Sequence, residues 1–247
     1  MAAETTFEFQ IVGDPQDLEE LLIALCESNP RPVKHESEYF LRVVWPGDDV
    51  IEARRHAREY VSRLKGAASL IIPQGCRPVT LREEEWYWID ESDRRIRGAG
   101  GIEWVSAQSY FRIDRNLDDE HQNRLRRRLR IVLSECEGAG TEDVKLRHIL
   151  QIMSKPSPSW SELYLAQELA WGIMSSMGVH TEFTEDIKHF KHTACSWSAL
   201  GIEARHGNKP EKEELSRENA MSYDDAFALV REYVKTLLEE IDKANLG

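Results

Sequence analysis

The chain has 247 residues, 41% of them hydrophobic and 31% charged, a composition typical of a folded globular protein. Its formal net charge is −12 at pH 7, shared evenly by the parts on either side of Arg115, which excludes general nucleic-acid binding through overall positive charge. No apolar run approaches the ~20 residues of a membrane-spanning helix, so we expect no membrane association. The four cysteines are widely spaced and form no CxxC pair, which indicates free thiols and a cytoplasmic location.

The first half opens with alternating strand and helix patterns. Alternating apolar residues predict a strand from Phe7 to Ile11, and helical spacing predicts a helix from Asp17 to Glu27. The aromatic and β-branched run Tyr39 to Trp45 predicts a second strand. An apolar stripe then predicts a helix from Asp49 to Leu64, which we expect to end at Gly66.

Further strands are expected before Arg115, where Gly and Pro clusters mark the turns. They comprise residues 69–72, 79–81, 84–89 and 102–113. Trp86, Trp88, Trp104 and Tyr110 recur at alternating positions, which predicts a sheet with one aromatic face. The three consecutive glutamates 83–85 argue against a nucleic-acid surface on these strands.

The second half has apolar residues at helical spacing throughout. We expect helices at Asp118–Cys136, Thr141–Met153, Trp160–Met177, Glu185–Gly201 and Tyr223–Ala244. Ser159 and Glu162 form the pattern of a capping box at the start of the third of these helices. Ser222 is expected to cap the last one.

These patterns predict an α+β protein with two domains. Residues 1–115 would form a mixed, β-rich domain with one or two helices, and residues 116–247 an all-helical bundle. The sequence contains no P-loop, dinucleotide-binding glycine motif, H-E-x-x-H or G-x-S-x-G motif, so most large enzyme classes lose support and no cofactor is expected.

A run of arginines occupies the first predicted helix of the second half: Arg124, Arg126, Arg127, Arg128 and Arg130. One interpretation is an RNA contact through Arg124, Arg127 and Arg128. The other is a solvated helix face whose arginines pair with nearby acids.

A metal site is a further hypothesis. His189 and His192 stand three residues apart on a predicted helix, and Glu185 precedes them by about one turn as a third ligand. The alternative is that both histidines are solvated among Lys188 and Lys191.

Three short motifs follow one another along the helical half. They are W-x-x-L-Y-x-x-x-E at Trp160, Leu163, Tyr164 and Glu168, A-R-H-G at Ala204–Gly207, and M-S-x-x-x-A at Met221–Ala226. In this order they resemble the helical C-terminal module of bacterial HEPN-like, abortive-infection type proteins, over roughly Trp160 to Glu240. The resemblance implies a helical bundle that forms a homodimer and acts on RNA as a metal-independent endoribonuclease, in host defence or toxin-type growth control.

The resemblance also implies roles for Arg205 and His206. His206 would transfer protons, and Arg205 would stabilise the charge that develops on the phosphate as the 2′-hydroxyl attacks. In the family the arginine and histidine are separated by several residues, whereas here they are adjacent; a spaced pair occurs at Arg115 and His121, ahead of the bundle.

One non-catalytic interpretation remains open. Arg205 and His206 could instead provide cationic side chains at the C-terminal end of a helix. The bundle would then be a scaffold that dimerises or binds a protein partner.

Overall fold

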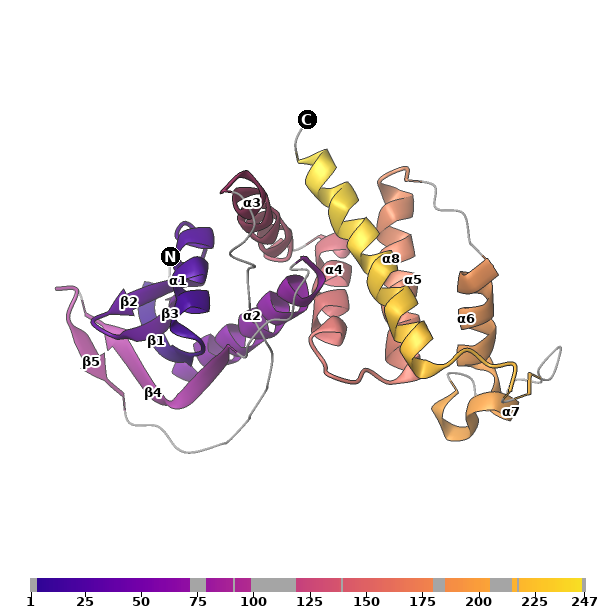
Figure 1. Ribbon diagram of the computed structural model, residues 1–247. Coiled ribbons are helices and arrows are strands. Elements are labelled where there is room, and N and C mark those ends of the chain that lie inside the picture. Colours follow the sequence, from indigo (N-terminus) through magenta and orange to yellow (C-terminus); the bar gives the residue numbers. More distant parts are fainter. Residues whose placement is uncertain are drawn as a thin grey trace. The chain divides into compact units, whose positions relative to one another are not determined.

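The computed structural model describes residues 4–71, 79–90, 92–98, 119–138, 140–179, 185–204, 215–216 and 218–245. The chain divides into two compact units, Met1–Ser134 and Glu135–Gly247. The first contains an antiparallel sheet with helices, and the described part of the second is helical (Figure 1). The predicted α+β class is therefore confirmed.

The sheet of the first unit has five strands in the order β2-β3-β1-β4-β5, and every neighbouring pair is antiparallel. The strands are β1 (Glu4–Val12), β2 (Arg31–His35), β3 (Glu38–Pro46), β4 (Thr80–Ile89) and β5 (Arg95–Arg97). Helix α1 (Pro15–Ala24) connects β1 to β2, and helix α2 (Val50–Ile71) lies between β3 and β4 in the chain. This β-α-β-β-α-β order, with β1 and β3 at the centre, is the ferredoxin-like arrangement, extended here by β5.

One face of the sheet is apolar and packs against α1 and α2. Phe9 has no exposed surface, and the Oη atom of Tyr39 donates a 2.8 Å hydrogen bond to Glu19 of α1. The ring of Trp45 lies 5.5 Å from the ring of His56 on α2. Because side chains alternate along a strand, residues such as Glu8, between Phe7 and Phe9, lie on the opposite face.

The predicted end of α2 at Gly66 is wrong, because the helix continues to Ile71. Residues 69–71 of the strand predicted at 69–72 are therefore helical. Gly66 is buried within it, and Leu70 and Ile71 extend its buried side. A glycine inside a helix costs about 1 kcal/mol, whereas burying Leu70 and Ile71 contributes about 1.5–3 kcal/mol each, so packing outweighs the local stop signal.

Two other strands differ from the expectation. The segments predicted at 79–81 and 84–89 are largely one strand, β4, whose register with β1 shifts where Phe9 pairs with Trp86 but Gln10 pairs with Arg82. Strand β2 was not predicted, because it is short and contains Pro32. The strand predicted at 102–113, with Trp104 and Tyr110, lies outside the described residues.

Helix α3 (Asp119–Glu135) packs within the first unit. Arg126 pairs with Glu20 of α1, with its Nε atom 2.7 Å from Oε2, and Nε of Arg130 donates a 2.9 Å hydrogen bond to the carbonyl of Ala24. These contacts place α3 with the sheet in the first unit. The predicted boundary at 115/116 lies outside the described residues.

The second unit is built around helix α5, which packs against α4, α6 and α8. Its helices are α4 (Thr141–Met153), α5 (Trp160–Ser176), α6 (Glu185–Cys195), α7 (Trp197–Leu200) and α8 (Tyr223–Ala244). The predicted helix at Glu185–Gly201 is interrupted at Ser196, whose Oγ atom accepts a 3.2 Å hydrogen bond from the backbone N–H of Ala199. A serine in this geometry caps a new helix, so α7 begins there and is followed by a 3₁₀ turn at Gly201–Glu203.

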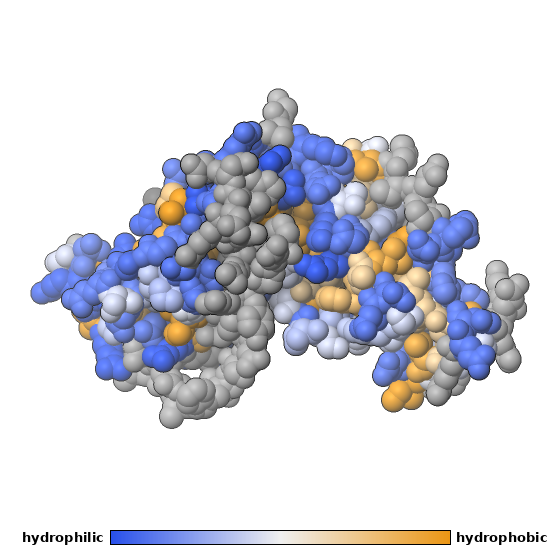
Figure 2. Space-filling model, in the orientation of Figure 1, coloured by the Kyte–Doolittle hydropathy of each residue, from blue (hydrophilic) through white to orange (hydrophobic). Residues whose placement is uncertain are grey.

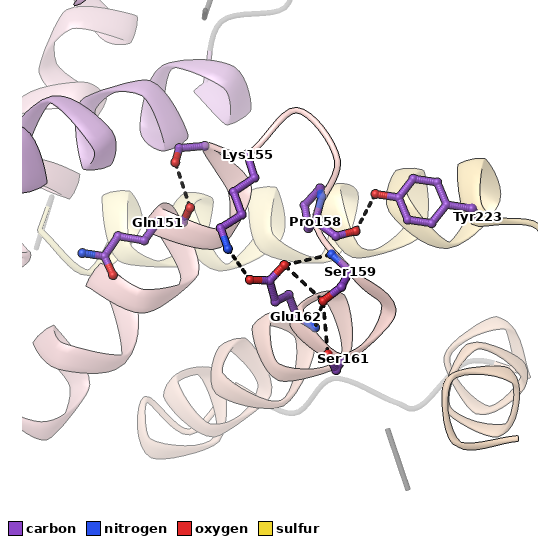
Figure 3. A network of polar contacts seen from close by, with 8 residues as sticks. Gln151, Lys155, Pro158, Ser159, Ser161, Glu162 and Tyr223 are labelled. Carbon is purple, nitrogen blue, oxygen red and sulfur yellow. Dashed lines mark hydrogen bonds and ion pairs between the residues drawn. The ribbon is translucent and has the colours of Figure 1, made fainter. Parts of the chain in front are cut away.

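The predicted capping box is present at the start of α5. Ser159 Oγ accepts from the backbone N–H of Glu162 at 3.3 Å, and the Glu162 carboxylate accepts from the backbone N–H of Ser159 at 2.8 Å (Figure 3). Lys155 points toward the same carboxylate and pairs with it. Tyr223 Oη donates a 2.6 Å hydrogen bond to the carbonyl of Pro158, which ties the first residue of α8 to the α4–α5 connection.

Hydrophilic residues cover most of the visible described surface of the first unit, whereas apolar patches appear around α5 and α6 in the second (Figure 2). Within the described ranges, no helix combines the length and apolar character needed to cross a bilayer. Among the described residues, Cys26, Cys136 and Cys195 form no disulfide.

Replacing Glu162 by glutamine is expected to remove a pH-dependent part of the stability of the second unit. The pKa of Glu162 lies below its ordinary value of 4.5, chiefly because Lys155 donates a hydrogen bond to the carboxylate and then because the backbone N–H of Ser159 does so. This contribution to stability is therefore complete above about pH 4.5 and is lost as the pH falls further. Thermal unfolding followed by circular dichroism at pH 7 and pH 3 measures the difference.

The wild type should lose more stability between these two pH values than Glu162→Gln does. Glu232→Gln, which removes an exposed carboxylate from α8, is the matched control and should behave as the wild type. Identical pH dependence in all three proteins would contradict the coupling of Glu162 to Lys155.

Candidate functional site

The predicted catalytic residues Arg205 and His206 lie outside the described residues. The last described residue before them is Ala204, which follows the 3₁₀ turn Gly201–Glu203. Helix α7 has only four residues, so the segment does not leave the end of a long helix. A helix this short has a small dipole, which weakens the interpretation of the two residues as cationic caps.

The motif residues on either side have structural roles in the second unit. Trp160 and Leu163 are buried in α5, and Ala226 is buried in α8. The Trp160 ring stacks on Phe190 of α6 at 6.2 Å and meets Tyr223 edge-on at 6.0 Å. These positions hold α5, α6 and α8 together.

The three arginines predicted to bind RNA lie on α3, in the first unit. Arg124 and Arg127 are exposed, and Arg128 is partly exposed. Residues three and four apart are neighbours on a helix surface, so the three guanidinium groups share one stretch of α3. From the same run, Arg126 instead pairs with Glu20 of α1, and Arg130 donates to the backbone carbonyl of Ala24.

The metal site proposed for Glu185, His189 and His192 does not form. Nε2 of His189 lies 2.8 Å from the backbone carbonyl of Asn219, and Glu185 pairs with Lys188 at 2.6 Å. Among the described residues, no group of three or more His, Cys, Asp or Glu side chains is arranged to hold a metal ion.

A charged cluster not predicted from the sequence lies on the polar face of the sheet. Its centre is Glu8 of β1, whose side chain has no exposed surface. Oε1 of Glu8 accepts a 2.9 Å hydrogen bond from Nε of Arg42 and lies 2.8 Å from Nη2 of the same residue. His35 Nε2 lies 3.1 Å from Oε1, and Arg95 Nε lies 2.8 Å from Oε2.

Two aromatic rings complete the surroundings of Arg95. Its guanidinium carbon lies 4.0 Å from the ring centroids of Phe40 and Tyr87, which meet edge-on. The Arg95 Nε contact with Glu8 is an ion pair without hydrogen-bond alignment, and Nη2 of Arg95 is buried without a hydrogen-bond partner in the described structure. The guanidinium is thus fixed by charge and ring contacts while part of its donor capacity is unused.

Strand register explains how these residues meet. Glu8 pairs with Arg42 on β3 and with Tyr87 on β4, so all three share a cross-strand row. The sequence signal was the charged residue between Phe7 and Phe9, matched by Arg42 within a strand pattern. His35 and Arg95 could not be assigned to the cluster, because β2 and β5 were not predicted.

The cluster contains no nucleophile beside a base. Its groups are suited to holding charged side chains in a fixed orientation. A buried carboxylate accepts strong, charge-assisted hydrogen bonds from guanidinium groups and thereby restricts their orientation. The arrangement therefore positions arginines at the surface of the sheet, where the side chains of Arg42 and Arg95 remain 19% and 23% exposed.

Comparisons with known proteins find no match to a protein-family model, a curated protein or a solved structure. The fold class follows from the observed elements, and the candidate roles follow from the chemistry of the residues themselves.

Glu8→Gln is expected to lower the free energy of unfolding by about 2–4 kcal/mol, because two guanidinium groups lose the charge that compensates them. Chemical denaturation followed by fluorescence and circular dichroism measures this change. Glu38→Gln, at an exposed position of β3, is the control and should cost less than about 1 kcal/mol. Equal effects of the two substitutions would contradict the central role of Glu8.

Proposed function

We propose that this protein binds and acts on RNA through its helical unit, as a HEPN-like protein in host defence or toxin-type growth control. The supporting observation is that residues of the flanking motifs, Trp160, Leu163 and Ala226, belong to the core of this unit.

The proposed reaction is metal-independent cleavage of RNA in the cytoplasm. His206 is the proton-transfer residue, because an imidazole titrates near neutral pH and serves as both base and acid. Arg205 stabilises the negative charge that develops on the phosphate as the neighbouring 2′-hydroxyl attacks. A homodimer would bring two such pairs together, as the family resemblance implies.

Basic residues outside the pair would assist binding. Arg124, Arg127 and Arg128 share one stretch of α3, and an exposed guanidinium group suits a phosphate contact. Such contacts set affinity and its dependence on salt without selecting a sequence.

A non-catalytic interaction scaffold is the second candidate function. Leu165 and Trp171 of α5 are each 41% exposed, and Val144 of α4 is 37% exposed. Large apolar side chains at the surface are typical of contacts with a protein partner or a second copy. Light scattering and a partner pull-down test this reading, and a strictly monomeric, partnerless protein would contradict it.

His206→Ala is expected to reduce cleavage of total RNA, incubated with the purified protein in chelator, by about 10²- to 10⁴-fold, because a general acid–base group is lost. Arg205→Ala should also reduce cleavage. The matched control is His148→Ala, which removes an exposed histidine from α4 of the same unit and should leave the rate unchanged.

Thermal unfolding of each variant separates lost chemistry from lost folding. Equal cleavage by the wild type and His206→Ala would dismiss His206 as catalytic. If the wild type binds RNA without cleaving it, the protein is an RNA-binding protein and the ribonuclease proposal fails.

A further inference from the structure

The core of the second unit contains a polar side chain that has no polar partner among the described residues. Gln167 of α5 has no exposed surface, and neither its Oε1 nor its Nε2 atom makes a hydrogen bond there. A glutamine amide has two N–H donors and a carbonyl acceptor to satisfy. Leaving a buried polar group unpaired costs enough to change an equilibrium by about tenfold to a hundredfold. An apolar side chain of similar size would therefore be more stable at this position.

Gln167 lies on the side of α5 that packs against α6. It follows Tyr164 by three residues and Trp160 by seven, and these spacings place the three side chains on one side of a helix. The rings of Tyr164 and Trp160 each lie 6.2 Å from the ring of Phe190 on α6. The amide therefore continues the aromatic side of α5 toward the middle of the helix.

Polar contacts fix the C-terminal end of α6 near the beginning of α5. The backbone N–H of Met221 donates a 3.0 Å hydrogen bond to Oγ1 of Thr193, close to the end of α6. Met221 comes two residues before Tyr223, which is bound to the α4–α5 connection. Since this end of α6 lies by the first turn of α5, the N-terminal half of α6 extends along α5 toward Gln167.

Helix α6 buries fewer apolar side chains than the other helices that pack against α5. It buries Ile187, Phe190 and Ala194. Helix α4 buries Leu146, Ile149, Leu150, Ile152 and Met153, and α8 buries Ala226, Val230, Val234, Leu237, Leu238 and Ile241. Segments with few buried apolar contacts open most readily, and a helix of 11 residues is too short to persist in water once it separates from its neighbours.

We propose that α6 opens from α5 by local unfolding, and that Gln167 sets how often this happens. In the closed form the amide is buried without a partner, whereas in the open form it reaches water. The unpaired amide therefore raises the free energy of the closed form alone and shifts the population toward the open form. Opening uncovers the side of α5 that carries the rings of Trp160 and Tyr164, and it does not require the proposed activity on RNA.

The test is Gln167→Met, because methionine is similar to glutamine in length and flexibility but lacks the amide. Amide hydrogen exchange of the full-length chain, followed by mass spectrometry, should show α6 exchanging faster than α4 and α8 in the wild type. In Gln167→Met, exchange of α6 should slow by about tenfold to a hundredfold. The matched control is Gln151→Met, the same change at a partly exposed position of α4, which should leave exchange of α6 within about twofold of the wild type.

Three outcomes would overturn the proposal. Equal exchange rates of α4, α6 and α8 in the wild type would show that α6 does not open on its own. Unchanged or faster exchange of α6 in Gln167→Met would show that the amide is satisfied in the closed form, for example by a buried water molecule. Loss of thermal stability in both Gln167→Met and a second variant, Gln167→Leu, has the same meaning.

Discussion

The sheet of the first unit depends on a carboxylate buried at its centre. A carboxylate without exposed surface is costly to bury unless cations and hydrogen-bond donors surround it, and Glu8 has both in Arg42, Arg95 and His35. These partners come from β2, β3 and β5, so one side chain on β1 couples four of the five strands. The apolar packing of α1 and α2 on the other face fixes which side of β1 Glu8 occupies, because a slip of one residue would exchange the two faces.

The second unit is organised by packing around α5 and by polar contacts at its N-terminal end. The capping box of Ser159 and Glu162 defines where α5 begins, and Tyr223 fixes the start of α8 against the same connection. The aromatic contact between Trp160 and Phe190 adds α6 to this end of the unit. The motifs that carry the resemblance thus include residues whose immediate role is packing, and the proposed chemistry depends on the Arg205–His206 segment between them.

Helix and strand periodicity predicted much of the fold, and the differences arise where tertiary packing outweighs local signals. α4 and α8 match their predicted bounds because their buried residues recur at helical spacing, and Ser222 caps α8 as predicted. α2 passes Gly66 because the residues beyond it are buried, and the break at Ser196 reflects one hydroxyl that competes for a backbone N–H. The Glu8 cluster could not be predicted, since its members come from four strands whose order and register depend on long-range pairing. Some arginines of α3 contact α1 and others are exposed. The sequence could not separate the two groups, because the position of α1 was not known from it.

Helix α8 supplies a wall of the core around α5, although it follows α5 by many residues in the chain. During synthesis, α4, α5 and α6 therefore leave the ribosome before the helix that covers them exists. In the first unit, strand β1 likewise emerges long before its partner β4, because Thr6 pairs with Ile89 and Val12 with Thr80. Each unit therefore exposes apolar surface during synthesis until a segment made much later covers it.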